Sequence, residues 1–366
     1  MAKQRYITPY DSVNAWIANE ESELTFRGTS PTDWAAWRAA FEQKLRALLG
    51  PWPDPVPLDP EVTESVDCGS YTRERVVYDT EKYMSVPAYV LVPKDIENGE
   101  KRPGILAAHG HGNGKSDVCG VPANEQEQAL IETLSYDYAV QFVERGYVVV
   151  APDWRGFGER RSPAEWARPN RDPCNVNYMA QGYLGHHLLA LQIWDGMRTV
   201  DYLASRPEVD ADRLGVGGLS FGGTMTTYLA ALDSRLKVAC ISGYVSTVKN
   251  DAITMRGRGN FCGSQYMPGL LTIGDIPEVA GLIAPRPLIC EMGTEDQCFV
   301  IENAKAGYAR VKAIYEAAGA GDQIDRDIFG GGHQWSGAKH LGVMRRRTRA
   351  SSESCHGEGL GSSWRR

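Results

Sequence analysis

The sequence predicts an α/β fold, with a mostly parallel central sheet flanked by helices, and two observations predict it. Short runs of Val, Ile, Leu and Ala, typical of strands buried on both faces, alternate with longer helical segments between residues 104 and 329. The chain is also long enough to bury a large core, since it has 366 residues, of which 42% are apolar and 23% charged. We therefore expect one large domain with a smaller addition rather than a disordered or fibrous chain.

Residues 1–60 are expected to form an N-terminal helical segment followed by a proline-rich connector. Ser30 is predicted to be a helix N-cap, with Pro31 at the first helical position and Asp33 in the first turn. Apolar residues then recur at helical spacing: Trp34, Trp37, Phe41, Leu45 and Leu48. Five prolines lie within residues 51–60, which excludes a helix there and marks the boundary with the main domain.

The main domain, residues 61–340, contains the alternating strands and helices. Two Val- and Tyr-rich strands, expected to be antiparallel, cover Tyr71–Asp79 and Ser85–Pro93. The buried strands that follow are Gly104–Ala108, Gly146–Ala151, Arg213–Gly217, Leu236–Ile241, Pro287–Met292 and Gln323–Phe329. The predicted helices are Leu134–Glu144, 187–205, Phe221–Leu232, Asp275–Ile283 and Val300–Ala318. Three connections have the length of lids and binding loops, namely 110–133, 154–186 and 243–273.

Charge distinguishes the C-terminal segment, residues 341–366, from the rest of the chain. It holds six Arg and two Glu, a net 6 − 2 = +4, so residues 1–340 carry −11 of the total of −7. With little apolar periodicity, it is expected to be a disordered Arg-rich tail, and whether it is native is left open. The overall negative charge argues against a nucleic-acid partner. The sequence lacks the apolar core of a signal peptide, and it lacks an apolar run of the roughly 18–20 residues that a membrane span needs. We therefore expect a cytoplasmic protein with no membrane partner.

The most informative motif is G-x-S-x-G at Gly218–Gly222, centred on Ser220. A predicted strand enters it and a predicted helix leaves it, so the serine is expected at a sharp turn that exposes its hydroxyl at the end of the sheet. Glycines on both sides avoid side-chain clashes in so tight a turn, and the helix N-terminus directs free N–H groups at developing negative charge. The context therefore favours Ser220 as a nucleophile over an ordinary Gly-rich turn.

A serine nucleophile needs a base, and the base needs an orienting acid. Of the seven histidines, His333 is the best placed, because it follows the last predicted strand in a Gly-rich loop. Asp296 is the preferred acid because it lies in the loop after strand 287–292, with the adjacent Glu295 as the alternative. The sequence thus predicts Ser220, Asp296 and His333 as a catalytic triad.

The H-G-x-G turn at His109–Gly112, directly after a strand, is predicted to supply an oxyanion hole. We assign its donors to the backbone amides of His111 and of Phe221, the residue after the nucleophile. A metal pair of His109 and His111 is the competing interpretation, but no third or fourth ligand lies at a suitable spacing. The eight cysteines are scattered without a CxxC pair, which argues against structural zinc and a disulfide scaffold. No metal and no cofactor are predicted.

These motifs make the chain resemble the α/β-hydrolase superfamily over about residues 65–340. The segments that carry the resemblance are His109–Gly112, Pro152–Gly158, Gly218–Gly222, Gly293–Asp296 and Gly332–His333. It implies the α/β-hydrolase fold, in which the triad follows the order Ser, Asp, His along the chain. Within the superfamily, the chain is similar to bacterial serine esterases related to dienelactone hydrolases and acetyl xylan esterases. Dienelactone hydrolases differ in using cysteine where this chain has Ser220 and in lacking a long helical N-terminal segment.

The resulting hypothesis is a serine carboxylesterase that hydrolyses short-chain acyl esters through an acyl-enzyme intermediate. Its partner is a small-molecule ester, which Trp154 and Tyr183 of the connection 154–186 are predicted to contact. Three alternatives stay open: acetyl xylan deacetylation or lactone hydrolysis, a serine peptidase on the same fold, and a catalytically inactive binding scaffold. Homo-oligomerisation is also left open.

Overall fold

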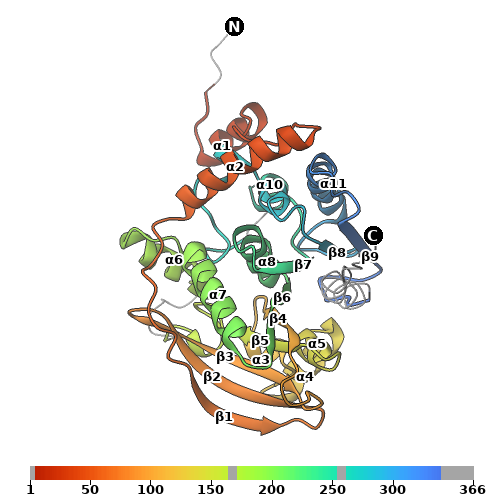
Figure 1. Cartoon of the computed structure of the whole chain (residues 1–366). Helices are drawn as coiled ribbons and strands as arrows, with labels where there is room; N and C mark the ends of the chain where they lie inside the picture. Colours follow the sequence, from red (N-terminus) through yellow and green to blue (C-terminus); the bar gives the residue numbers. More distant parts are fainter. Residues whose placement is uncertain (1–4, 164–170, 254–260, 339–366) are drawn as a thin grey trace, which may run out of the picture.

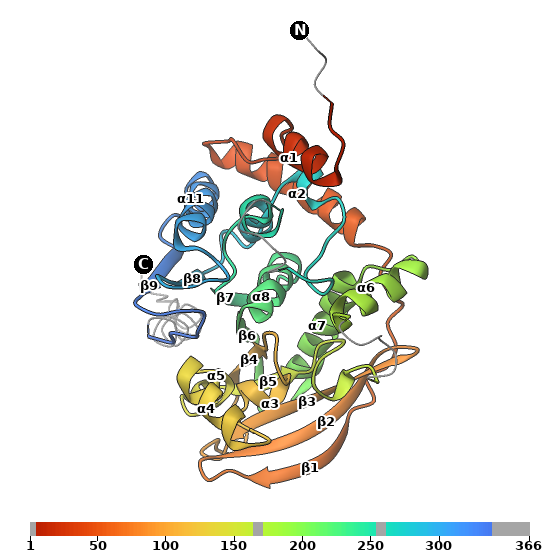
Figure 2. The same cartoon turned by 180° about the vertical axis from the view of Figure 1, so that it is seen from behind.

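The computed structural model describes residues 5–163, 171–253 and 261–338, which form a nine-stranded sheet of order β1-β2-β3-β5-β4-β6-β7-β8-β9 (Figures 1 and 2). Three antiparallel strands form one edge: β1 (Glu61–Asp67), β2 (Tyr71–Glu81) and β3 (Met84–Pro93). The six parallel strands are β4 (Arg102–Ala108), β5 (Val148–Pro152), β6 (Val209–Leu219), β7 (Leu236–Ser242), β8 (Leu288–Gly293) and β9 (Ile324–Phe329). The predicted mostly parallel α/β sheet is confirmed.

Neighbouring side chains of the parallel strands point to opposite faces and fill two separate cores. Leu106 and Val150 belong to one core, whereas Ile105 and Val149 belong to the other. The helices that bury side chains in the first core include α2 (Pro31–Leu49), α7 (Leu188–Ser205), α8 (Phe221–Leu232), α10 (Ile276–Gly281) and α11 (Ile301–Ala317). The second core lies under α4 (Glu125–Leu134) and α5 (Tyr138–Val143), on the other side of the central strands (Figure 1). Coverage on both faces explains why these strands are continuously apolar.

The helix boundaries differ from the predicted ones in the first two long connections. The predicted helix Leu134–Glu144 is wrong at its start, because α4 ends at Leu134 and α5 begins only at Tyr138. Ser135 lies between them with a φ of 50°, in the left-handed region that ends a helix. The connection 154–186 contains a further helix, α6 (Pro173–Tyr183), and the shorter helices are α3 (Lys115–Val118) and α9 (Leu270–Ile273).

The N-terminal segment forms α1 (Pro9–Asn19) and α2, and α2 packs into the same core as the sheet. The predicted N-cap is confirmed, since the Ser30 hydroxyl accepts a hydrogen bond from the Asp33 amide at 3.2 Å. Residues 51–60 form neither helix nor strand before β1, and the predicted tail at 341–366 lies outside the described residues. No helix in the described ranges is both long and apolar enough to cross a bilayer.

We expect Phe41→Ala to lower the free energy of unfolding by about 3–5 kcal/mol, because the ring is fully buried in α2 and stacks on Trp37 at 5.3 Å. Urea denaturation of the two proteins measures the difference. Tyr10→Ala on α1, where the side chain is 64% exposed, is the matched control and should change stability by no more than about 0.5 kcal/mol. Equal effects of the two substitutions would contradict a shared cooperative core.

Candidate active site

Ser220 lies in a strained turn between β6 and α8. Its φ of 64° and ψ of −120° are rare for a residue with a side chain, and its amide donates to the Ser242 carbonyl at 3.0 Å. A Cβ added to Gly218 or Gly222 would come within 2.3 Å or 1.9 Å of the Ala108 carbonyl oxygen. Glycine is therefore required at both positions, and the predicted strand–turn–helix context of the motif is confirmed.

The structure brings the side chains of His333 and Asp296 together. His333 Nδ1 lies 2.7 Å from Asp296 Oδ2, and the imidazole stacks on Phe299 with a centroid distance of 5.7 Å. The second carboxylate oxygen of Asp296, Oδ1, accepts hydrogen bonds from the amides of Cys298 and Phe299 at 2.7 and 2.9 Å. Because both oxygens are engaged, the carboxylate has a fixed orientation toward the imidazole.

Backbone contacts also hold the His333 loop against the Asp296 loop. The amides of Thr294 and Glu295 donate to the carbonyls of Phe329 and Gly331 at 3.0 and 2.8 Å. A Cβ on Gly293 would lie 2.3 Å from the Gly332 carbonyl oxygen, so the two loops touch. Glu295, the alternative acid, is exposed, whereas Asp296 is buried.

The second ring nitrogen of His333, Nε2, is buried and has no hydrogen-bond partner among the described residues. The ring lies at the end of β7, where a Cβ on Gly243 would meet His333 Cε1 at 3.0 Å and Leu219 Cδ1 at 2.9 Å. Gly243 is therefore in contact with both the imidazole and the residue that precedes Ser220. A substrate in front of Ser220 would find this free nitrogen nearby.

The H-G-x-G turn passes directly beside Ser220. A Cβ on Gly110 would lie 3.3 Å from Ser220 Cβ and 2.9 Å from the Leu219 carbonyl oxygen. The Gly110 amide donates to the Tyr136 hydroxyl at 2.8 Å, but within the described part of the chain the amides of His111 and Phe221 donate no hydrogen bond. Both amides are available to an acceptor, and their role as oxyanion donors stays a prediction.

His109 is a buried structural residue rather than half of a metal pair. Its Nε2 accepts a hydrogen bond from the Trp154 amide at 3.0 Å, and its Nδ1 lies 2.8 Å from the Gly110 carbonyl oxygen. Burial lowers its pKa to about 4, so the imidazole is neutral at pH 7 and carries its proton on Nδ1. Both ring nitrogens are engaged, and the interaction ties the H-G-x-G turn to the connection after β5.

Buried ion pairs, which the sequence analysis missed, anchor that connection. The Lys115 ammonium binds Asp153 at 2.6 Å, and Asp195 of α7 binds Arg155 and Arg160 at 2.7 and 2.8 Å. Burial opposes ionisation of Asp195, but Arg160 and Arg155 lower its pKa to about 2. These basic residues are therefore paired with buried carboxylates.

The two predicted substrate contacts lie in opposite environments. Trp154 is fully buried beside the His109 ring at 6.0 Å, whereas Tyr183, at the end of α6, is 93% exposed. Trp154 therefore has no surface available to a substrate in this conformation. A role for either residue in substrate binding stays a prediction.

An apolar cavity of about 320 Å³ lies near His333, separated from the imidazole by the ring of Phe299. Its lining includes Tyr228, Tyr244, Phe261, Met267 and Leu270. The rings of Tyr244 and Phe261 lie 5.8 and 5.9 Å from that of Phe299, which stacks on the imidazole. The sequence did not indicate this cavity, because its lining comes from three separate segments of the chain.

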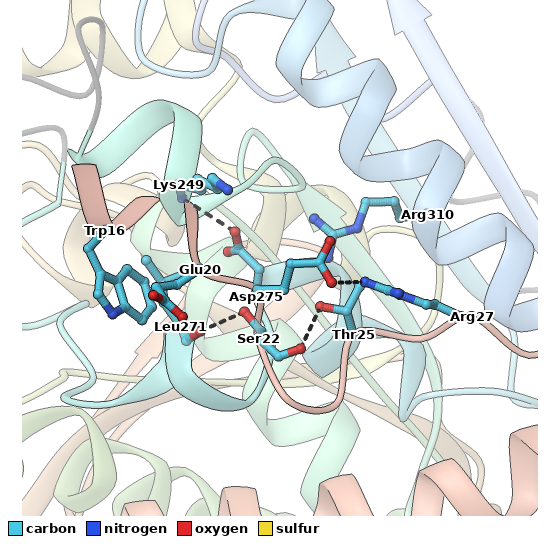
Figure 3. A pocket seen from close by; sticks show the side chains of 10 residues that line it. Trp16, Glu20, Ser22, Thr25, Arg27, Lys249, Leu271, Asp275 and Arg310 are labelled. Atoms are coloured by element: carbon cyan, nitrogen blue, oxygen red, sulfur yellow. Dashed lines mark hydrogen bonds and ion pairs between the residues drawn. The ribbon is translucent and has the colours of Figure 1, made fainter. Parts of the chain in front are cut away.

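A separate cavity of about 200 Å³ lies between the N-terminal segment and the loop before α10 (Figure 3). Asp275 on its wall accepts hydrogen bonds from the amides of Val248 and Ile276, both at 2.7 Å, and burial raises its pKa to about 6. The residues that line this cavity in the described structure include none of the predicted catalytic residues. We therefore place it outside the active site.

The fold and this arrangement define the chain as a hydrolase of the α/β class. It belongs to the Abhydrolase family, whose model matches residues 1–329. YtaP of Bacillus subtilis (strain 168), provisionally named a hydrolase, is 29% identical over 293 residues, which is 78% of this chain and 90% of that protein.

Solved structures show the same fold. A Bacteroides fragilis NCTC 9343 protein, provisionally named an acetyl xylan esterase, is 21% identical with a TM-score of 0.74, covering 89% of this chain and 83% of that one. A glucuronoyl esterase from Solibacter usitatus is 16% identical with a TM-score of 0.65, covering 90% of this chain and 97% of that one.

Proposed function

We propose that the protein is a serine carboxylesterase that uses Ser220, His333 and Asp296. The observation that carries the proposal is the 2.7 Å hydrogen bond between His333 and Asp296. It lies at the carboxyl ends of the parallel strands, where Ser220 occupies its strained turn. A buried carboxylate that orients an imidazole toward a partly buried serine is the arrangement that activates a weak nucleophile.

In this mechanism Ser220 Oγ attacks the ester carbonyl, and His333 Nε2 takes the hydroxyl proton. Asp296 keeps the other imidazole proton on Nδ1 and stabilises the imidazolium. The amides of His111 and Phe221 bind the oxyanion of the tetrahedral intermediate. His333 then returns the proton to the leaving alcohol, and water hydrolyses the acyl-enzyme by the same route.

The relatives support an ester rather than an amide substrate, since two of the similar structures carry the names of carbohydrate esterases. Deacetylation of sugars is therefore the variant of this function that we favour next, ahead of lactone hydrolysis. The peptidase and the inactive scaffold remain the alternatives from other classes.

Pre-steady-state hydrolysis of p-nitrophenyl acetate tests the proposal. We expect a burst of p-nitrophenol close to one equivalent per active site, because acylation by this activated ester is expected to be faster than deacylation of the same serine. A linear time course at the rate of buffer alone would support the scaffold, and faster cleavage of peptide p-nitroanilides than of esters would support the peptidase.

We expect short acyl chains of about two to four carbons to be preferred, as the family resemblance implies. Aromatic rings bound the cavity near His333, and Arg155 and Arg160 are paired with the buried Asp195. Values of kcat/KM for p-nitrophenyl acetate, butyrate, octanoate and palmitate measure the preference.

A maximum at octanoate or beyond, or activation at an oil–water interface, would contradict this expectation. The surface that would meet such an interface is the end of α6, where Met179, Tyr183 and Leu184 are exposed. Replacing Leu184 with Ser is the matched control, because it removes apolar surface there and should leave hydrolysis of acetate unchanged.

A further inference from the structure

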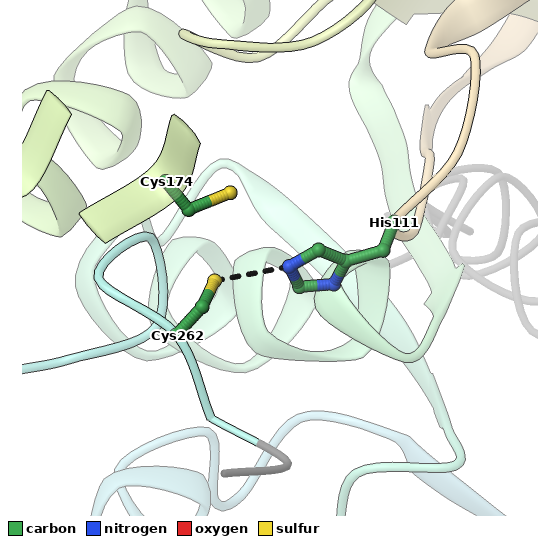
Figure 4. A group of neighbouring side chains, drawn as sticks. All are labelled: His111, Cys174 and Cys262. Carbon is green, nitrogen blue, oxygen red and sulfur yellow. Dashed lines mark hydrogen bonds between the residues drawn. The ribbon is translucent and has the colours of Figure 1, made fainter. Parts of the chain in front are cut away.

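Three side chains with metal-binding atoms converge beside the H-G-x-G turn. His111 Nε2 and the sulfur atoms of Cys174 and Cys262 all lie within 4.8 Å of one another, and the imidazole nitrogen is 3.0 Å from the Cys262 sulfur (Figure 4). They come from the turn after β4, the first turn of α6 and the segment that begins at residue 261. Sequence spacing could not indicate this cluster, since its members are 63 and 88 residues apart.

The surrounding structure holds each of the three side chains in place. The His111 ring packs against Phe157 and Phe221, with centroid distances of 5.2 and 5.4 Å. The Cys174 amide donates to the helix cap Asp172 at 2.8 Å, which fixes the first turn of α6.

The segment that carries Cys262 is also tied to α6. The Gly263 amide donates to the Asn175 side chain at 2.8 Å, and a Cβ on Gly263 would lie 2.6 Å from the Cys174 carbonyl oxygen. The two cysteines are therefore held next to each other by contacts that do not involve their sulfur atoms. A ligand set of this kind is formed before the ion arrives.

We propose that His111, Cys174 and Cys262 bind one Zn²⁺ or another soft d¹⁰ cation. Two thiolates and one imidazole are donors that zinc prefers, with bonds of about 2.3 Å to sulfur and about 2.0 Å to nitrogen. Such bonds place tetrahedral donors about 3.5–3.8 Å apart, which the present spacing permits with small side-chain movements. On binding, both thiols lose their protons to solvent as the sulfur–metal bonds form, and water completes the fourth position.

The second group of metal-binding atoms in the described chain is less suited to an ion. It consists of Asp296, Cys298 and His333, and its carboxylate is already bonded to the imidazole and to two backbone amides. An ion there would break the His333–Asp296 interaction. The Cys298 thiol therefore provides a matched control for the proposed site.

Titration of the reduced full-length protein with Co²⁺ and Zn²⁺ tests the proposal without reference to catalysis. We expect one Co²⁺ per chain, with the thiolate-to-cobalt charge-transfer absorption and intense visible bands of a tetrahedral complex, and displacement by Zn²⁺. Cys174→Ser and Cys262→Ser should each weaken binding at least about 100-fold, since each removes a direct ligand, whereas Cys298→Ser should bind as the wild type does.

X-ray absorption spectroscopy of the zinc-loaded wild type tests the proposal even if a variant does not fold. We expect two sulfur atoms and one imidazole nitrogen in the first coordination shell of the zinc ion. Unchanged binding by both cysteine variants, loss of binding in Cys298→Ser alone, or a zinc shell without sulfur would overturn the proposal. The proposal would also be overturned if Cys174 and Cys262 formed a disulfide in air and the reduced protein bound no ion. Because the readout is metal binding, a failure of the proposed esterase function would leave this result unaffected.

Discussion

Replacement of Ser220 by Ala is expected to reduce kcat for p-nitrophenyl acetate by about 10⁴–10⁶-fold, with the fold retained. The change removes only the hydroxyl that attacks the carbonyl. Alanine keeps the Cβ that lies against Gly110, and the amide that donates to the Ser242 carbonyl is unaffected. Steady-state and burst kinetics measure the loss, and thermal denaturation tests that the variant is folded.

Ser205→Ala is the matched control for Ser220, because it removes a hydroxyl that bonds only within the end of α7, to the Tyr202 carbonyl at 2.7 Å. Its turnover should equal that of the wild type. Near-wild-type turnover by a folded Ser220→Ala protein would mean that another group is the nucleophile.

Replacement of His333 by Ala is expected to be about as damaging as loss of the serine, because members of a triad act as a unit. The buried Asp296 would lose its partner, and Ser220 would lose the nitrogen that accepts its proton. Partial rescue of the rate by added imidazole would distinguish loss of a base from a structural defect.

His340→Ala and His356→Ala, both in the part of the chain beyond the described residues, are the controls for this histidine and should be mild. A loss at His340 comparable to that at His333 would transfer the role of base to His340. Asp296→Asn should also slow turnover, by about 10⁴-fold, since the amide favours the wrong imidazole tautomer.

The fold was predictable where the burial of a strand or helix produces a clear pattern of apolar residues in the sequence. The central parallel strands are apolar on both faces, so a continuous apolar run indicated each of them. The edge strand β1 was not predicted, because nearly all of its residues are exposed and the sequence Glu61–Asp67 shows no apolar pattern. The break between α4 and α5 depends on the conformation of Ser135, a residue type that also occurs within helices.

The candidate site was predictable where local sequence dictates local geometry. Gly218 and Gly222 are needed for the approach of the turn to Ala108, and the loops of Asp296 and His333 follow strands that end at the same edge. Substrate contacts were harder to predict, since an aromatic residue in a long connection can point inward, as Trp154 does, or into solvent, as Tyr183 does.

By itself, the sequence determined the alternation of strands and helices, the turn around Ser220 and the order of the three predicted triad residues, because each depends on neighbours in the chain. Only the tertiary structure decided that His109 binds the Trp154 amide, that Asp195 pairs with Arg155 and Arg160, and that His111 meets Cys174 and Cys262. These contacts join residues 35 to 151 positions apart in the chain. Packing of the loops at the end of the sheet creates them, and no local pattern of residues encodes that packing.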